Sequence, residues 1–305
     1  MTAPRAQVSP TTAPRADAAD DTAIHDLGYR RYEGPRVGAT GAWRALYWQG
    51  LRTMFGIGRS AKAKVIPVFL VLVSMMRAVA MVLAFSVSNG AQPIRYGAMI
   101  GDQLLLFVLF IAAQAPELLS RDQQHRVLPL LLTREVSRAS YASARLLAMF
   151  TALFVAALAP LLFAYIGEIG TAIDPVAAFG SMGSRIGPIL AIATLTAFMM
   201  SGVASALVVW TPRRAYATTA IIGAFLIAAA IATGLDDLAG VSMRTAEMLD
   251  PIRALRTLAL VLFGETNRGM ELNPPAAIGF YIALEVGLGV AGALIMHWRL
   301  RRVVV

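Results

Sequence analysis

Six apolar runs constrain this chain more than any other feature, because each is close to the roughly 20 residues that a helix needs to cross a bilayer. The runs cover residues 65–85, 96–115, 146–166, 186–210, 216–233 and 277–298. The third, fourth and fifth contain no charged residue. A soluble protein could not bury six helices that are apolar on every side, since too few polar faces would remain. The sequence therefore predicts an all-α membrane protein with six transmembrane helices.

The composition supports a membrane protein and excludes several kinds of chemistry. Of the 305 residues, 57% are hydrophobic and only 15% are charged, against about 25% charged in an average soluble domain. There is no cysteine, which excludes disulfide scaffolds, thiol catalysis and cysteine-ligated metal sites. The three histidines, at positions 25, 125 and 297, are scattered along the chain. We therefore expect no metal site and no cofactor on this chain.

The basic residues predict how the chain lies in the membrane. An even number of spans places both termini on one side. Twenty Lys and Arg residues flank the spans on that side, and six lie on the other side. Because positive charge collects in cytoplasmic loops, both termini are expected in the cytoplasm. The basic residues are 25 Arg and two Lys, a bias typical of GC-rich bacterial genomes, so we expect the membrane to be a bacterial inner membrane. The net charge of +9 is then a topology signal, and no nucleic-acid partner is expected.

The segment before the first span divides into two parts. Residues 1–24 are rich in Pro, Ala, Thr and charge, so we expect a disordered cytoplasmic tail. Residues 25–64 contain an apolar stripe with helical spacing, made of Trp43, Leu46, Tyr47, Leu51, Met54 and Phe55. Basic residues lie off the stripe, which predicts an amphipathic helix that lies in the membrane interface. A helix packed on a small soluble core is the alternative, but nothing nearby in the sequence supplies that core.

The segment before the last span is too long for a plain connection. It runs from residue 234 to 276, and loops of that length are uncommon without structure of their own. Asp250 followed by Pro251 is typical of a helix start, and Ile252, Leu255 and Leu258 then form an apolar face. We expect a short extracellular helix here, in the outer leaflet or re-entrant. Residues 65–305 together form the predicted transmembrane domain.

A polar segment, residues 116–145, interrupts the apolar pattern on the predicted cytoplasmic side. Pro116 is expected to end the second span. Charged residues surround a leucine cluster, and the residues concerned are Glu117, Arg121, Asp122, Leu130, Leu131, Leu132, Arg134 and Arg138. An apolar knob rimmed by charges favours a docking surface for a soluble partner. A solvated helical hairpin is the alternative.

This segment resembles the second intracellular segment of exporter-type (ABC-2-like) ABC transporter permeases. The residues that carry the resemblance are Glu117, Ser120-Arg121-Asp122, the run 128–132, the run 133–138 and Tyr141. The resemblance implies a permease subunit whose loop contains a coupling helix that contacts the ATPase. The coupling residues it implies are Glu117, Arg121, Asp122, Leu130, Leu131, Leu132, Arg134 and Arg138. It also implies that the amphipathic helix before the first span is the elbow helix of that family. It also implies two copies of a separate ATPase subunit, and a second permease half that is the same chain or a relative.

The chain itself is not expected to be an enzyme. It contains no GxxxxGK[S/T] phosphate loop, so ATP and magnesium are expected on the partner ATPase. The resemblance implies an amphipathic or hydrophobic cargo such as a drug, a lipid or a peptide. Two other functions stay open, namely a secondary transporter and a non-transporting membrane anchor or sensor subunit.

Three charged residues, Arg77, Asp102 and Glu285, fall within the predicted spans. Such residues are costly in a bilayer and are usually paired or functional. Arg77 and Glu285 each lie eight residues from the outer end of their spans. We therefore predict that Arg77 pairs with Glu285 or Asp102, with structural neutralisation favoured over substrate contact. The glycines at 287, 289 and 292 spell GxGxxG, which in an apolar span indicates close helix packing.

Overall fold

The computed structural model describes Gly34 and residues 38–58, 61–124, 136–172, 174–239, 247–265 and 274–302. The chain divides into two units, Met1–Arg36 and Val37–Val305, and the second contains every element below. These elements are α1 (Ala39–Met54), α2 (Ala61–Val87), α3 (Tyr96–Gln124), α5 (Arg138–Gly170), α6 (Pro175–Met182), the 3-10 helix η1 (Gly183–Arg185), α7 (Ile186–Val208), α8 (Arg214–Ala239), α10 (Pro251–Leu262) and α11 (Pro274–Arg301). The tail predicted over residues 1–24 lies outside the described residues.

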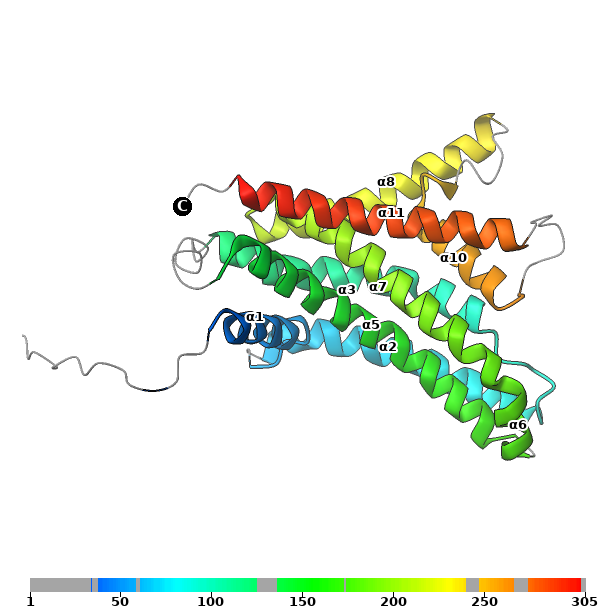
Figure 1. Cartoon of the computed structure of the whole chain (residues 1–305). Coiled ribbons are helices and arrows are strands. Elements are labelled where there is room, and N and C mark those ends of the chain that lie inside the picture. The colour runs from blue at the N-terminus through cyan, green and yellow to red at the C-terminus, as the bar shows by residue number, and fades with distance from the viewer. Residues whose placement is uncertain are drawn as a thin grey trace, which may run out of the picture. The chain divides into compact units, whose positions relative to one another are not determined.

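The described residues contain six stretches that are long and apolar enough to cross a membrane, which confirms the predicted all-helical, multi-pass class. These stretches are Lys64–Val87, Tyr96–Gln124, Arg138–Gly170, Pro175–Val208, Arg214–Leu235 and Ala276–Arg301. The fourth predicted run overshoots α7 by two residues, because the chain turns after Val208. The six long helices run side by side, with α1 at one end of them and α10 at the other (Figure 1). We call these the α1 end and the α10 end.

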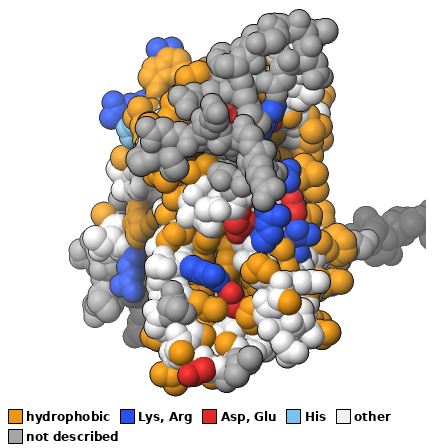
Figure 2. Space-filling model, turned by 90° about the vertical axis from the view of Figure 1, so that its right-hand side faces the viewer, with side chains coloured by type: hydrophobic (Ala, Val, Ile, Leu, Met, Phe, Trp, Pro, Cys, Tyr) orange, Lys and Arg blue, Asp and Glu red, His pale blue; other side chains and the backbone are white. Residues whose placement is uncertain are grey.

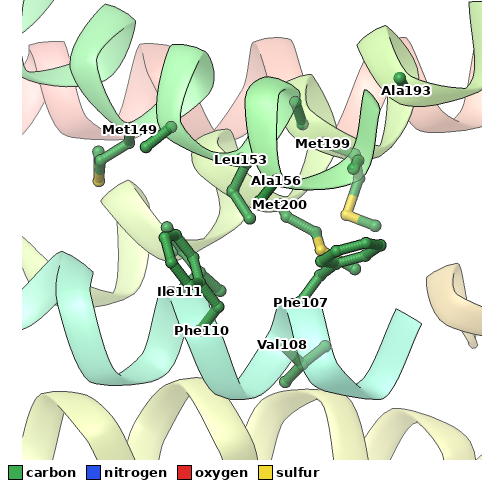
Figure 3. Close-up of a cluster of buried hydrophobic side chains, with 14 of the residues drawn as sticks. Phe107, Val108, Phe110, Ile111, Met149, Leu153, Ala156, Ala193, Met199 and Met200 are labelled. Carbon is green, nitrogen blue, oxygen red and sulfur yellow. The ribbon is translucent and has the colours of Figure 1, made fainter. Parts of the chain in front are cut away.

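Helix α3 occupies the centre of the bundle. It packs against α1, α2, α5, α7, α8 and α10. Phe107, Phe110 and Ile111 of α3 meet Leu153 of α5 and Met200 of α7 in a buried apolar cluster (Figure 3). Helices α2 and α8 are peripheral, and only a small share of their side chains is buried within the protein. The outer faces of α2 and α8 therefore offer an apolar surface to lipid.

The prediction that Pro116 ends the second span is wrong. Helix α3 continues through Pro116 for two more turns, to Gln124. Proline lacks an N–H, so the carbonyl of Ala112, four residues earlier, loses its helical donor. Thr218 of α8 supplies a replacement, since its hydroxyl donates to the Ala112 carbonyl at 2.9 Å. Repair of this kind by a neighbouring helix is what allows proline inside membrane helices.

Helix α1 packs against the protein through its apolar stripe. Leu46 and Met54 of the stripe are buried, and Tyr47 donates a hydrogen bond to Thr151 of α5 at 3.2 Å. The predicted helix is therefore present, and its apolar stripe lies against the helical bundle. Helix α5 begins at Arg138, before the predicted third span, and its N-terminal part, which includes Ser143, Ala148 and Thr151, provides the surface for α1.

Helix α10 begins where the sequence predicts. The Asp250 carboxylate caps it by accepting hydrogen bonds from the backbone N–H groups of Ile252 (3.0 Å) and Arg253 (3.1 Å). At 12 residues the helix is too short to cross a bilayer. Leu255 and Leu258 are buried, and the helix packs against α3 and α11. It therefore closes one end of the bundle.

Helices α7 and α11 meet at glycines. A Cβ added to Gly292 of α11 would lie 2.2 Å from the carbonyl oxygen of Gly202 in α7, and one added to Gly202 would lie 2.3 Å from that of Gly289. Such distances leave no room for any side chain, so the two backbones touch. A Cβ on Gly287 would meet nothing within 4 Å. The predicted packing role is therefore confirmed for Gly289 and Gly292, and it is wrong for Gly287.

Gly292→Ala should destabilise the bundle by about 1–3 kcal/mol, because the added methyl must push α7 and α11 apart. Thermal unfolding in detergent measures the effect. Gly287→Ala is the matched control on the same helix and should unfold at the wild-type temperature. Equal unfolding temperatures for the two variants would contradict the glycine contact.

Candidate functional site

A buried arginine joins three helices at the α1 end. Arg145 of α5 is only 2% exposed. Its Nη2 donates to Asp122 Oδ2 of α3 at 2.7 Å, and its Nη1 donates to Gln49 Oε1 of α1 at 2.7 Å. The Tyr141 hydroxyl donates to the same Asp122 oxygen at 2.8 Å. We call Gln49, Asp122, Tyr141 and Arg145 the α1-end network.

The α1-end network makes the position of α1 sensitive to both α3 and α5. A buried ion pair gains little over an apolar replacement, but removal of one partner leaves a buried charge uncompensated. The Arg145 guanidinium also lies 5.4 Å from the centre of the Tyr141 ring, in a cation–π contact. Gly50 keeps α1 close, since a Cβ there would lie 2.9 Å from Cβ of Ala148 in α5. The three helices are therefore fixed to one another at this end.

The last two turns of α3 are also tied to the turn between α7 and α8. Arg214 of α8 forms an ion pair with the nearly buried carboxylate of Glu117. The Ser120 hydroxyl donates to the Thr211 carbonyl at 2.8 Å. The segment of α3 beyond Pro116 is thus held from two sides, by the α1-end network and by the α7–α8 turn.

An open groove of about 1090 Å³ lies between α1 and this end of α3. Its lining includes Trp48 and Arg52 of α1, Arg121 and Asp122 of α3, and Arg145. Trp48, Arg52 and Arg121 are exposed, whereas Asp122 is paired within the network. The groove therefore presents an aromatic ring and two cationic side chains.

The predicted docking residues are described in part. Glu117, Arg121 and Asp122 line the groove. Arg138 starts α5, and its Nη1 donates to the Arg301 carbonyl of α11 at 2.7 Å. The remaining predicted docking residues, Leu130, Leu131, Leu132 and Arg134, lie outside the described residues. We call residues 125–137, between α3 and α5, the docking segment. The structure thus places the two flanks of this segment on α3 and α5, next to α1.

The other polar centre lies at the α10 end. Arg77 of α2 forms an ion pair with the Asp102 carboxylate of α3, and Arg256 Nη2 of α10 lies 3.1 Å from Asp102 Oδ1. Arg77 therefore pairs with Asp102 and not with Glu285. This follows from the packing, since α2 packs against α3 and α5 while α11 packs against α7 and α10. Figure 2 looks onto this end and shows charged side chains gathered among apolar ones.

The start of α3 is capped by a carboxylate from the segment after α10. Glu265 accepts hydrogen bonds from the backbone N–H groups of Gly97 (3.0 Å) and Ala98 (2.9 Å). Arg95 Nε lies 3.7 Å from the same carboxylate. A negative charge at a helix N-terminus is stabilising, so Glu265 joins the chain after α10 to α3.

Two further carboxylates are buried near the α10 end and are fully partnered. Glu168 accepts from the Tyr96 hydroxyl at 2.6 Å and from Arg185 Nη1 at 2.7 Å. Glu247 accepts from the Thr257 hydroxyl at 2.7 Å and from the Tyr281 hydroxyl. Buried polar groups of this kind are normally satisfied, and these four contacts stabilise the α10 end.

Glu285 of α11 is different. Its side chain is fully buried, and neither carboxylate oxygen has a hydrogen-bond partner among the described residues. A buried carboxyl group without a hydrogen-bond partner costs free energy in either protonation state, and the charged form costs more than the neutral form. Glu285 is therefore a destabilising group that the packing of the described residues does not explain.

The sequence did not single out several of the residues that form these centres, namely Gln49, Arg145, Glu168, Arg185, Glu247 and Glu265. Arg145 directly precedes the third predicted span, and Glu168 follows it by two residues. Charged residues at the ends of apolar runs are therefore a usable signal. Gln49 gives no such signal, because its role depends on where α1 packs.

The fold and its two polar centres define a multi-pass, all-helical membrane protein whose charges are concentrated towards the two ends of the bundle. Comparison with protein-family models and with curated proteins finds no match to this chain. Among the described residues, no three His, Cys, Asp or Glu side chains cluster closely enough to hold a metal ion.

Arg145→Ala should destabilise the protein by about 3–5 kcal/mol, because it leaves the Asp122 carboxylate without its charged partner. Arg121→Ala, an exposed arginine of the same groove, is the control and should change stability by less than about 0.5 kcal/mol. The variants are compared by thermal unfolding and by protease cleavage between α1 and α2. Arg145→Leu combined with Asp122→Leu should recover part of the loss. An Arg145→Ala protein as stable as Arg121→Ala would contradict the role of the network.

Glu285→Gln should leave the unfolding temperature unchanged or raise it, since it removes a carboxylate without a partner and keeps the side-chain shape. Glu168→Gln is the matched control, because it removes one half of an ion pair and should lower the unfolding temperature. A large loss of stability in Glu285→Gln would show that Glu285 has a partner in the folded protein.

Proposed function

We propose that this chain is the membrane-spanning permease subunit of an ABC transporter. The proposal rests above all on the α1 end, where a buried network joins α1, α3 and α5 directly beside the predicted docking segment. Helix α3 ends at Gln124 and α5 begins at Arg138. A partner that binds the 13 intervening residues therefore acts on two rigid helices at once.

The two flanking helices offer a mechanical route through the bundle. Helix α3 carries Asp122 near the α1 end and Asp102 near the α10 end. Helix α5 likewise carries Arg145 near the α1 end and Glu168 near the α10 end. A partner that binds the docking segment more tightly in one state of the bundle than in another would shift the bundle toward that state. Such a difference in binding is what coupling between distant sites requires. In this proposal the elbow helix is α1, and the α1-end network keeps it moving with α3 and α5.

The energy source lies on another polypeptide, because the chain contains no phosphate loop. Two ATPase subunits that bind ATP and magnesium would dock on two permease halves, formed by two copies of this chain or by this chain and a relative. The cargo would be an amphipathic or hydrophobic drug, lipid or peptide that crosses the bacterial inner membrane. The α1 end, with its docking segment, would face the cytoplasm.

Glu285 favours a second candidate, a secondary transporter driven by an ion gradient. It lies 11 residues after the start of α11 and 16 before its end, so it is near the middle of the membrane helix. Buried ionisable residues at this depth serve as proton or ion sites in such transporters. The α1-end network has no role in that mechanism, and for this reason we favour the ABC permease.

Copurification tests the proposal. A tagged chain extracted in mild detergent should retain an ATPase that contains a phosphate loop. Leu131→Ala combined with Leu132→Ala should lower the amount retained about tenfold, as truncation of a central apolar contact does at interfaces. Leu249→Ala, an exposed leucine near α10, is the matched control and should retain the wild-type amount.

The energy source separates the two candidates. In vesicles that contain the chain and its copurified partner, cargo movement should require ATP and should persist when a protonophore collapses the proton gradient. Movement that needs the gradient and continues without ATP would overturn the ABC proposal and support secondary transport through Glu285.

A further inference from the structure

The charged centre at the α10 end contains an excess of positive charge. Arg77 and Arg256 share the single carboxylate of Asp102. Their side chains are 41% and 55% exposed, and that of Asp102 is 36% exposed. Each guanidinium has five N–H donors, and one from each is directed at Asp102. One net charge and several donors therefore remain available on a surface that is otherwise largely apolar.

The surrounding packing holds these groups in place. Ser74 of α2 and Gln103 of α3 are buried and exchange two hydrogen bonds, at 2.7 and 3.2 Å, next to the ion pair in sequence. Gly101 of α3 allows Arg256 to approach, since a Cβ there would lie 2.8 Å from Arg256 Cγ. The stem of Arg256 thus lies against the backbone of α3, which directs its guanidinium to Asp102. Arg77 and Arg256 are therefore held in place by their neighbours, unlike isolated arginines on a surface.

This site lies at a depth in the membrane that suits contact with the headgroup of a lipid. Asp102 lies six residues after the start of α3, or about 9 Å along the helix at 1.5 Å per residue. Arginine side chains extend from such a depth toward the membrane interface. Guanidinium groups bind phosphate through charge-assisted hydrogen bonds, so two arginines at this depth can contact the phosphate of a lipid headgroup. The nearby pair Arg95 and Glu265 is balanced one to one and offers no such excess.

We propose that Arg77 and Arg256, which flank Asp102 and share its carboxylate, bind the phosphate of an anionic phospholipid at the α10 end. The two guanidiniums would each donate N–H groups to phosphate oxygens, as arginine does in charge-assisted pairs. The acyl chains would lie along the exposed apolar face of α2, which includes Met76 and Leu83. The site requires no ATPase and stands independently of the transport proposal.

The test uses the full-length purified chain in a neutral detergent with three probes. These are dioleoylphosphatidylglycerol, dioleoylphosphatidylcholine and oleate, and bound probe is counted by native mass spectrometry. Wild-type protein should retain phosphatidylglycerol in preference to phosphatidylcholine. Arg77→Gln and Arg256→Gln should each reduce this retention about threefold to tenfold. Arg95→Gln is the matched control at the same end and should retain the wild-type amount.

Asp102→Asn separates anion binding from a purely structural role. Removal of the carboxylate leaves two unopposed guanidiniums, so retention of phosphatidylglycerol should rise if the site binds phosphate. If the cluster only stabilises the fold, the same variant should lose stability and bind no more lipid. Thermal unfolding of each variant shows whether a loss of binding reflects loss of the fold.

Several results would overturn the proposal. One is equal retention of the two phospholipids by wild-type protein. Another is retention in Arg77→Gln and Arg256→Gln that matches Arg95→Gln. Retention of oleate without phosphatidylglycerol would assign the site to a carboxylate ligand and would likewise reject a phospholipid.

Discussion

The structure depends on the requirement that each backbone polar group within a hydrocarbon layer finds a partner inside the protein. Long helices meet this requirement almost everywhere. At Pro116 the helix cannot, and Thr218 of α8 supplies the missing donor to Ala112. Because that repair keeps α3 continuous, the helix carries Asp122 past the apolar region to Arg145. A break at Pro116 would separate Asp122 from the part of α3 that packs at the centre of the bundle.

Helix α3 consequently links the two polar centres. Asp102 and Asp122 are 20 residues apart on one helix, or about 30 Å at 1.5 Å per residue. Each carboxylate faces arginines from other helices, α2 and α10 at one end and α5 at the other. A displacement of α3 along its axis would disturb both centres together. This arrangement gives physical content to the proposal that an event at the α1 end changes the α10 end.

The sequence predicted the membrane class, the six spans and the start of α10, because apolar length and the Asp250-Pro251 pair are local signals. It failed where the answer depends on a neighbouring helix. The local sequence placed the end of the second span at Pro116, because the residue that replaces the missing hydrogen bond, Thr218, lies about 100 residues away along the chain. The surface that buries α1 was missed for the same reason, and so was Gln49. Arg77 could be assigned to a pair, but only the packing of α2 on α3 selects Asp102 over Glu285.

In the proposed mechanism, a nucleotide-driven partner at the α1 end moves helices at the α10 end. The natural chain has no cysteine, so spin labels can be attached to cysteines introduced at Val87 of α2 and Ile231 of α8, both exposed. In the purified complex with its ATPase, the distance between the labels should shift when ATP is trapped with vanadate. It should not shift for the chain alone. A distance distribution that ATP leaves unchanged in the complex would contradict the claim.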